Sequence, residues 1–254
     1  DEVQQSPARR LFHRGVRRGA DEHLPGVAAT CSNLGDIHAD RGEYDEALLL
    51  YEKSIALYQE MKAPLGEGKA QRDIGDIYVR MGRYAEAEVQ YGKALSLIQK
   101  LYSFANLSKS LVMAGRKAEA EIYAARAYLN AVQYKFKEAV SNIKEASQIY
   151  YAIQDTIGLL ATVNQLADVS LSWGHVEDAI RYYNGVKEDA KNIIDNYPDA
   201  YMFFSILLQS LAGLGNAYSQ QGSYQQAEAS YNEALSIAEK YNCLLYTSPS
   251  PRDL

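Results

Sequence analysis

Small and apolar residues recur at spacings of three and four along most of the chain, as between Ala47 and Tyr58. That period places them on one face of an α-helix, with polar residues on the other. The strict alternation of apolar and polar residues that marks a half-buried strand is lacking. Glycines such as Gly42, Gly82 and Gly115 fall between the periodic runs, where turns are expected. The pattern predicts an all-α chain.

The helical pattern itself repeats along the chain. Residues 34–51 read Leu-Gly, then Gly-x-Tyr-x-x-Ala, then Tyr, and residues 74–91 give the same series with Ile in place of Leu, at a constant offset of 40. The series returns at 214–234, more loosely at 166–183, and most loosely at 107–127. A fixed period of this size indicates an α-solenoid, in which antiparallel helix pairs stack and bury a continuous core.

Each position of the series has a physical role. Gly42 can adopt the positive φ that ends a first helix, and Ala47 lets the second helix approach closely. Gly35 is expected inside a helix, where glycine reduces helix stability by about 1 kcal/mol relative to alanine. Its presence there indicates a helix contact too close for a side chain. Tyr51 is expected to fill the space between neighbouring pairs.

This series resembles the tetratricopeptide repeat, and the 40-residue spacing resembles scaffolds of the G-protein-regulator and kinesin-light-chain type. The resemblance is strong over 28–100 and 208–241 and moderate over 160–190. It implies a helical repeat domain over 24–242 with about five to six repeats. It also implies a concave groove lined by the first helix of each pair.

Residues 101–152 depart from the repeat, since Ala120 and Ala139 are only 19 residues apart. Phe136, Ala139, Ile143 and Ala146 nevertheless have the spacing of a second helix. Two interpretations remain open. Residues 117–132 serve as the first helix of that unit, or one helix is shortened.

Both ends of the chain differ from the repeats. Residues 1–23 hold five arginines between positions 9 and 18, and we expect a basic, poorly ordered arm. Residues 243–254 resemble translated sequencing-adaptor read-through, with a genuine Ser/Pro linker as the alternative. If the tail is foreign, we expect the natural protein to continue past about Asn242.

Composition narrows the class of protein. The formal net charge of −6 argues against nucleic acid as the general partner. No apolar run approaches the roughly 20 residues that span a bilayer, so membrane insertion is not expected. Two distant cysteines do not form a disulfide framework, which favours a cytoplasmic setting.

The sequence offers no constellation for catalysis. The four histidines are scattered, and there is no His-Glu-x-x-His, Cys-x-x-Cys or phosphate-loop pattern. We therefore expect neither an enzyme nor a bound metal or cofactor.

Polar residues of the expected first helices recur about four apart and are the candidate groove residues. They are Ser32, Asp36, Asp40, Lys69, Arg72, Asp76, Arg80, Lys109, Asn164, Asp168, Gln209, Asn216 and Gln220. Their mixed signs favour a partner peptide or helix that carries both charges and amides. Ser32 and Asp36 stand where a tetratricopeptide carboxylate clamp would have lysine and asparagine, which argues against capture of a terminal carboxylate there.

The sequence therefore predicts a non-catalytic scaffold that binds a segment of another protein in its groove. The alternative is a regulatory or sensor arm of a larger enzyme or signalling protein. The sequence gives no indication of the oligomeric state.

Overall fold

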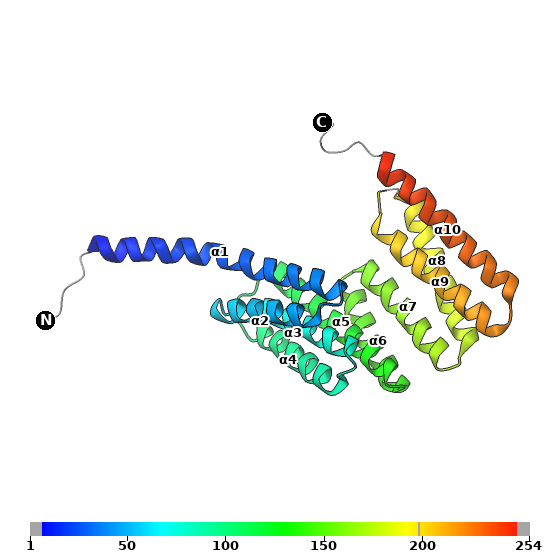
Figure 1. Cartoon of the computed structure of the whole chain (residues 1–254), viewed down its shortest axis with the longest axis horizontal. Helices are drawn as coiled ribbons and strands as arrows, with labels where there is room; N and C mark the ends of the chain where they lie inside the picture. The colour runs from blue at the N-terminus through cyan, green and yellow to red at the C-terminus, as the bar shows by residue number, and fades with distance from the viewer. Residues whose placement is uncertain (1–6, 198, 248–254) are drawn as a thin grey trace. The chain divides into compact units, whose positions relative to one another are not determined.

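The computed structural model describes the backbone of residues 7–197 and 199–247, and the side chains of 23–197 and 199–240. Within these residues the chain forms ten α-helices and no strand (Figure 1). The helices are α1 (Pro7–Asp40), α2 (Tyr44–Glu60), α3 (Pro64–Arg80), α4 (Tyr84–Tyr102), α5 (Lys109–Val132), α6 (Phe136–Ala152), α7 (Thr156–Ser172), α8 (Val176–Asn196), α9 (Met202–Gln221) and α10 (Tyr224–Thr247). The predicted all-α class is confirmed.

The chain divides within α5, between Ala125 and Arg126, into two compact units. In unit 1, residues 1–125, α1 packs on α2, α2 on α3, and α3 on α4. In unit 2, residues 126–254, each helix from α6 to α10 packs on the next, and α7 also packs on α9. Helix pairs thus stack within each unit, which confirms the α-solenoid. The described residues form five pairs, α1–α2, α3–α4, α5–α6, α7–α8 and α9–α10.

Short turns make the two helices of a pair antiparallel. At the end of α1, Gly42 has a φ of 77°. Its amide donates to the Ala39 carbonyl, and the Glu43 amide donates to the His38 carbonyl, which is the Schellman pattern. Gly82, Gly174 and Gly222 end their helices in the same left-handed conformation. The α5–α6 turn places Tyr134 there instead, with a φ of 60°.

The core consists of the small and aromatic residues that the repeat predicts. Ala47, Ala87 and Ala179 are fully buried at the start of second helices. In unit 1, Tyr51 lies in one apolar cluster with Ile74 and Ile77 of α3, so it fills the space between neighbouring pairs as expected.

In the structure, residues 117–132 belong to the helix that precedes α6, which agrees with the first of the two interpretations of 101–152. Helix α5 runs unbroken from Lys109 to Val132, and α6 buries Ala139, Ile143 and Ala146 as its partner. The expectation of a turn at Gly115 is wrong, because Gly115 lies inside α5. A Cβ atom there would come within 2.9 Å of the Leu101 side chain, so the glycine serves close packing.

The ends of the described chain are helical. Helix α1 begins at Pro7, so the backbone of 7–23 is helical where we expected a poorly ordered arm. Five arginines, a residue that favours helix, lie in this stretch. Helix α10 continues to Thr247, past the end expected near Asn242. Residues 1–6 and 248–254 lie outside the described residues.

None of the described helices is long and apolar enough to cross a membrane.

Candidate partner-binding groove

A tyrosine of the second helix bonds to a polar residue of the first helix in four of the five pairs. The Tyr51 hydroxyl donates to Asp36 Oδ1 over 2.7 Å, and Tyr91 donates to Asp76 Oδ1 over 2.5 Å. Tyr183 donates in the same way to Asp168. In the α9–α10 pair, the Tyr231 hydroxyl donates to Asn216 Oδ1 over 2.6 Å. Four predicted groove residues are therefore held in place from within the fold.

A glycine next to the acceptor makes room for the tyrosine ring in three of these four pairs, and Gly213 of α9 does so for Tyr183. A Cβ atom on Gly35 would lie 2.7 Å from Tyr51 Cε1, and one on Gly75 would lie 2.5 Å from Tyr91 Cε1. These distances are too short for real side chains, so the expected close contact at the helical glycines is confirmed. Burial raises the pKa of Tyr51, and the hydrogen bond to the Asp36 carboxylate raises it further. The hydroxyl therefore stays protonated and donates.

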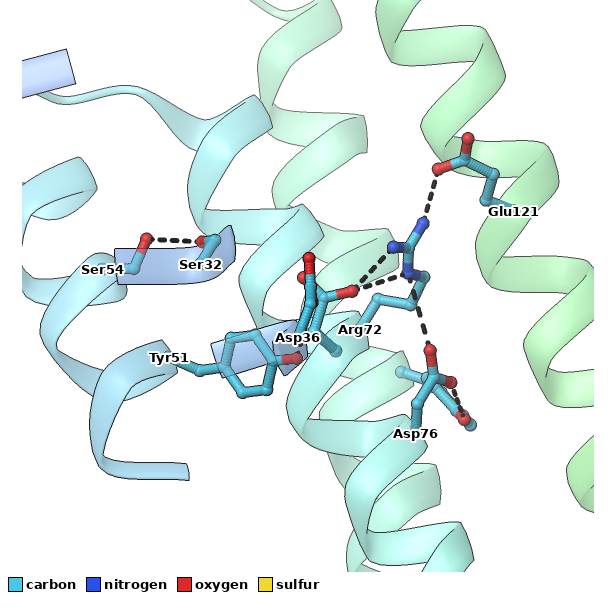
Figure 2. Close-up of polar contacts among 9 residues, drawn as sticks. Ser32, Asp36, Tyr51, Ser54, Arg72, Asp76 and Glu121 are labelled. Atoms are coloured by element: carbon cyan, nitrogen blue, oxygen red, sulfur yellow. Dashed lines mark hydrogen bonds and ion pairs between the residues drawn. The ribbon is translucent and has the colours of Figure 1, made fainter. Parts of the chain in front are cut away.

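Five of the predicted groove residues come together in unit 1. Asp36 and Asp40 of α1 and Arg72, Asp76 and Arg80 of α3 line one pocket with a volume of about 220 Å³. Asp73 and Tyr51 complete its polar lining. Figure 2 shows Arg72 extending from α3 toward Glu121 of α5, with Asp76 beside it.

Arg72 is the centre of the charge network in this pocket (Figure 2). Its Nη2 lies 2.6 Å from Asp73 Oδ1, its Nη1 lies 2.5 Å from Glu121 Oε2 of α5, and its Nε lies 3.8 Å from Asp76 Oδ2. Burial opposes the charged guanidinium, but the Asp73 and Glu121 carboxylates outweigh it and raise the pKa of Arg72. Its positive charge is therefore satisfied inside unit 1.

The second arginine is engaged more loosely. Arg80 Nη1 donates to the Ala39 carbonyl over 3.2 Å and lies 3.7 Å from Asp40 Oδ1. The Asp40 side chain remains 79% exposed. Within the part of the chain whose side chains are described, Asp36 has no ion pair and accepts only from the neutral Tyr51 hydroxyl.

The pocket has an acidic balance, since four carboxylates and two guanidiniums line it. Burial raises the pKa of Asp73 to about 6, although Arg72 opposes the shift. The arrangement can therefore attract a cationic group more readily than an anionic one.

Three other predicted residues of unit 1 lie outside this pocket. The Ser32 hydroxyl is 2.8 Å from the buried Ser54 hydroxyl of α2, so it joins the two helices of the first pair. Lys69 of α3 and Lys109, the first residue of α5, are exposed and do not line the pocket.

In unit 2 the predicted residues lie on α7 and α9. Asn164 is 4% exposed, and its Nδ2 donates to the Ile206 carbonyl over 3.2 Å, so it belongs to the α7–α9 contact. Gln209 and Gln220 are exposed on α9. Asp168 and Asn216, although exposed, accept from their tyrosines.

The sequence did not identify Asp73, Glu121 or the tyrosine hydroxyls as parts of this site. The tyrosine bonds had a visible signal, because donor and acceptor are always 15 residues apart. Glu121 had none, because its bond to Arg72 joins residues 49 positions apart in the irregular part of the chain.

Comparison with protein families finds the tetratricopeptide repeat at residues 26–100 and again at 209–241. Comparison with curated proteins finds no match.

Solved structures share the fold over most of the chain. BtubC (BKLC) from P. vanneervenii is 23% identical, with a TM-score of 0.65 over 96% of this chain and 89% of that one. A putative kinesin light chain from Podosopora anserina, with nearly identical TPR-like repeats, is 19% identical, with a TM-score of 0.56 over 84% of this chain and 95% of that one.

A third similar structure is a signal-transduction ATPase with a tetratricopeptide repeat sensor, from Pyrococcus horikoshii. It is 17% identical, with a TM-score of 0.63 over 91% of this chain, which corresponds to 34% of that protein. The two family matches and the shared fold agree with the repeat of glycine, alanine and tyrosine described above. The chain therefore carries tetratricopeptide repeats at residues 26–100 and 209–241, within an α-solenoid fold.

Proposed function

We propose that this protein is a non-catalytic scaffold and that the groove of unit 1, lined by Asp36, Asp40, Arg72, Asp76 and Arg80, binds a segment of a partner protein. The tetratricopeptide fold is typical of protein–protein interaction. The observation that supports this groove is the pocket between α1 and α3, where charged side chains are already positioned by internal hydrogen bonds. A preformed polar surface reduces the ordering cost of binding.

The charges of this groove favour a partner segment rich in lysine or arginine. Arg72 is already neutralised by Asp73 and Glu121, whereas Asp36 accepts only from the Tyr51 hydroxyl and Asp40 lies 3.7 Å from Arg80. A cationic side chain could approach Asp36 without displacing an internal cation, and it could share the 79% exposed Asp40 with Arg80. This narrows the sequence-based expectation of a partner with mixed charges.

Replacement of Asp36 and Asp40 by asparagine tests whether the charges of these two residues attract the partner segment. Asn216 holds its tyrosine through an amide oxygen, so Asp36→Asn should keep the Tyr51 bond while it removes the charge. Fluorescence polarisation would measure the affinity of labelled peptides that differ only in lysine or glutamate content. We expect the double variant to bind the lysine peptide roughly tenfold more weakly, a loss of about 1.4 kcal/mol.

Asp168→Asn is the control, because it changes the same tyrosine bond in unit 2, outside this pocket. Equal binding of lysine and glutamate peptides would contradict the proposal. So would an unchanged affinity in a double variant that keeps its circular dichroism spectrum.

A cytoplasmic setting belongs to this proposal. Cys31 is the cysteine whose side chain is described, and it is buried and forms no disulfide. A free thiol is typical of the reducing cytoplasm. Expression of the tagged chain, followed by cell fractionation, would test it.

A second candidate is a sensor or regulatory arm of a larger protein. Its support is the likeness to the structure that contains a tetratricopeptide repeat sensor, of which this chain corresponds to 34%. The transcript sequenced through both ends would decide. A reading frame that contains only further repeats before its stop codon would exclude this candidate.

A further inference from the structure

A second concave site lies on unit 1, away from the groove residues. It has a volume of about 510 Å³ and is formed where α2 ends, α3 begins and α4 ends. That volume is in the range of specific ligand sites. None of the groove residues lines it.

One side of this site is apolar. Leu97 of α4, Pro64 at the start of α3 and Phe104 just after α4 line it. Phe104 is 46% exposed, although a residue of this size gains roughly 1.5–3 kcal/mol when it is fully buried. An aliphatic side chain of a ligand would cover this surface.

The other side is cationic. Lys62 and Lys100 line the site, both are exposed, and neither ammonium is paired with a carboxylate in residues 23–197 and 199–240. The lining also holds one acidic residue, Glu67, which accepts from Gln59 Nε2 over 2.8 Å, so two ammonium groups face one carboxylate.

The start of α3 adds to the positive character. Ala63 occupies the N-cap position and provides no side-chain acceptor. By contrast, Asp155 at the start of α7 accepts from the Gly158 amide. An uncapped helix start leaves backbone amides, here those that follow Pro64, and the positive end of the helix dipole available to an anion, as at the starts of α2 and α4.

We propose that this site, the lysine pocket defined by Lys62, Lys100, Leu97, Pro64 and Phe104, binds an acidic linear segment of a partner protein. An aliphatic side chain of that segment packs on Leu97 and Phe104. Adjacent Asp or Glu carboxylates pair with Lys62 and Lys100. The pocket is thus opposite in charge preference to the groove of unit 1 and would engage a different segment.

The test begins with selection of short random peptides on the full chain, displayed so that bound sequences can be read. We expect a recovered class in which aliphatic residues stand beside Asp or Glu. The variant Lys62→Glu with Lys100→Glu should weaken a recovered acidic peptide by at least roughly tenfold in fluorescence polarisation. Phe104→Ser should weaken the same peptide without a change in its salt dependence.

The matched control is Lys53→Glu with Lys93→Glu, which makes the same charge change at exposed positions of α2 and α4 outside the pocket. This control should change the affinity by less than about twofold. Asp36→Asn with Asp40→Asn should also leave the acidic peptide bound, so failure of the groove and failure of the lysine pocket are distinguishable.

Two results would overturn the inference. One is the absence of any recovered peptide whose affinity responds to Lys62→Glu with Lys100→Glu while the folded spectrum is kept. The other is a concentration-dependent dimer in light scattering that this variant abolishes, because a second copy of the chain would then occupy the pocket.

Discussion

The hydroxyl of Tyr91 donates to Asp76 over 2.5 Å, and the ring that carries it fills the space that a side chain on Gly75 would need. One tyrosine therefore fixes both the separation of α3 and α4 and the position of a groove carboxylate. The same device holds Asp36 through Tyr51. Packing and the groove surface are coupled in this fold.

Tyr91→Phe is expected to destabilise the protein by about 1–2 kcal/mol, because the buried ring stays but its bond to Asp76 is lost. Asp76→Asn should cost less than Asp76→Ala, since an amide oxygen can accept as Asn216 does. Urea denaturation followed by circular dichroism measures both effects. Tyr84→Phe is the control at a half-exposed tyrosine and should change stability by less than about 0.5 kcal/mol.

The repeat could be predicted from the sequence wherever glycine, alanine and tyrosine keep their spacing. The α5–α6 pair could not, because its turn has Tyr134 in the left-handed conformation where other pairs have glycine. Relative to that turn, Tyr128 and Ile143 stand in place of the polar acceptor and the tyrosine. This pair therefore lacks the bond that identifies the others, and Ile143 is buried as an ordinary core residue.

The candidate groove could be predicted only in part. Helical spacing correctly brought Asp36, Asp40, Arg72, Asp76 and Arg80 to one pocket. The same spacing could not show that Asn164 turns into the core, because burial depends on how closely α9 approaches α7. It also could not show that the charge of Arg72 is already satisfied by Glu121, since that depends on where α5 packs.

Gly75→Ala is expected to destabilise the protein by about 1–3 kcal/mol, because the new Cβ would overlap the Tyr91 ring. Alanine would otherwise favour a helix by roughly 1 kcal/mol over glycine. Gly92→Ala on α4 is the matched variant, since open space surrounds its Cβ position. It should stabilise the protein by about 0.5–1 kcal/mol in the same denaturation experiment. Equal effects at the two sites would contradict the packing described for Tyr91.

Asp73 should make stability depend on pH. Its pKa is about 6 in the folded protein and about 4 in an unfolded chain. Between these values the folded state binds more protons, so the free energy of unfolding decreases as the pH rises from 4 to 6. Asp73→Asn should reduce this decrease by up to about 3 kcal/mol. Urea denaturation across this range measures it.

Asp189→Asn provides the comparison for the pH series, because it removes an exposed acid from α8. Asp73→Asn also removes one partner of Arg72, which shifts stability at every pH, so the slope is the informative quantity. A slope that is the same in Asp73→Asn and in the original protein would show that Asp73 is not responsible.

Arg72→Ala should destabilise the protein strongly, by about 2–4 kcal/mol, because it leaves the Asp73 and Glu121 carboxylates near one another without their cation. Arg80→Ala should cost less than about 1 kcal/mol, since its side chain is 48% exposed and lies 3.7 Å from Asp40. Thermal unfolding of both variants measures the difference. Comparable losses would mean that Arg72 is not the structural centre of the pocket. If the difference holds, charge reversal at Arg72 cannot report on partner binding, because it would disturb unit 1 itself, whereas variants of Asp36 and Asp40 leave the Arg72 network intact.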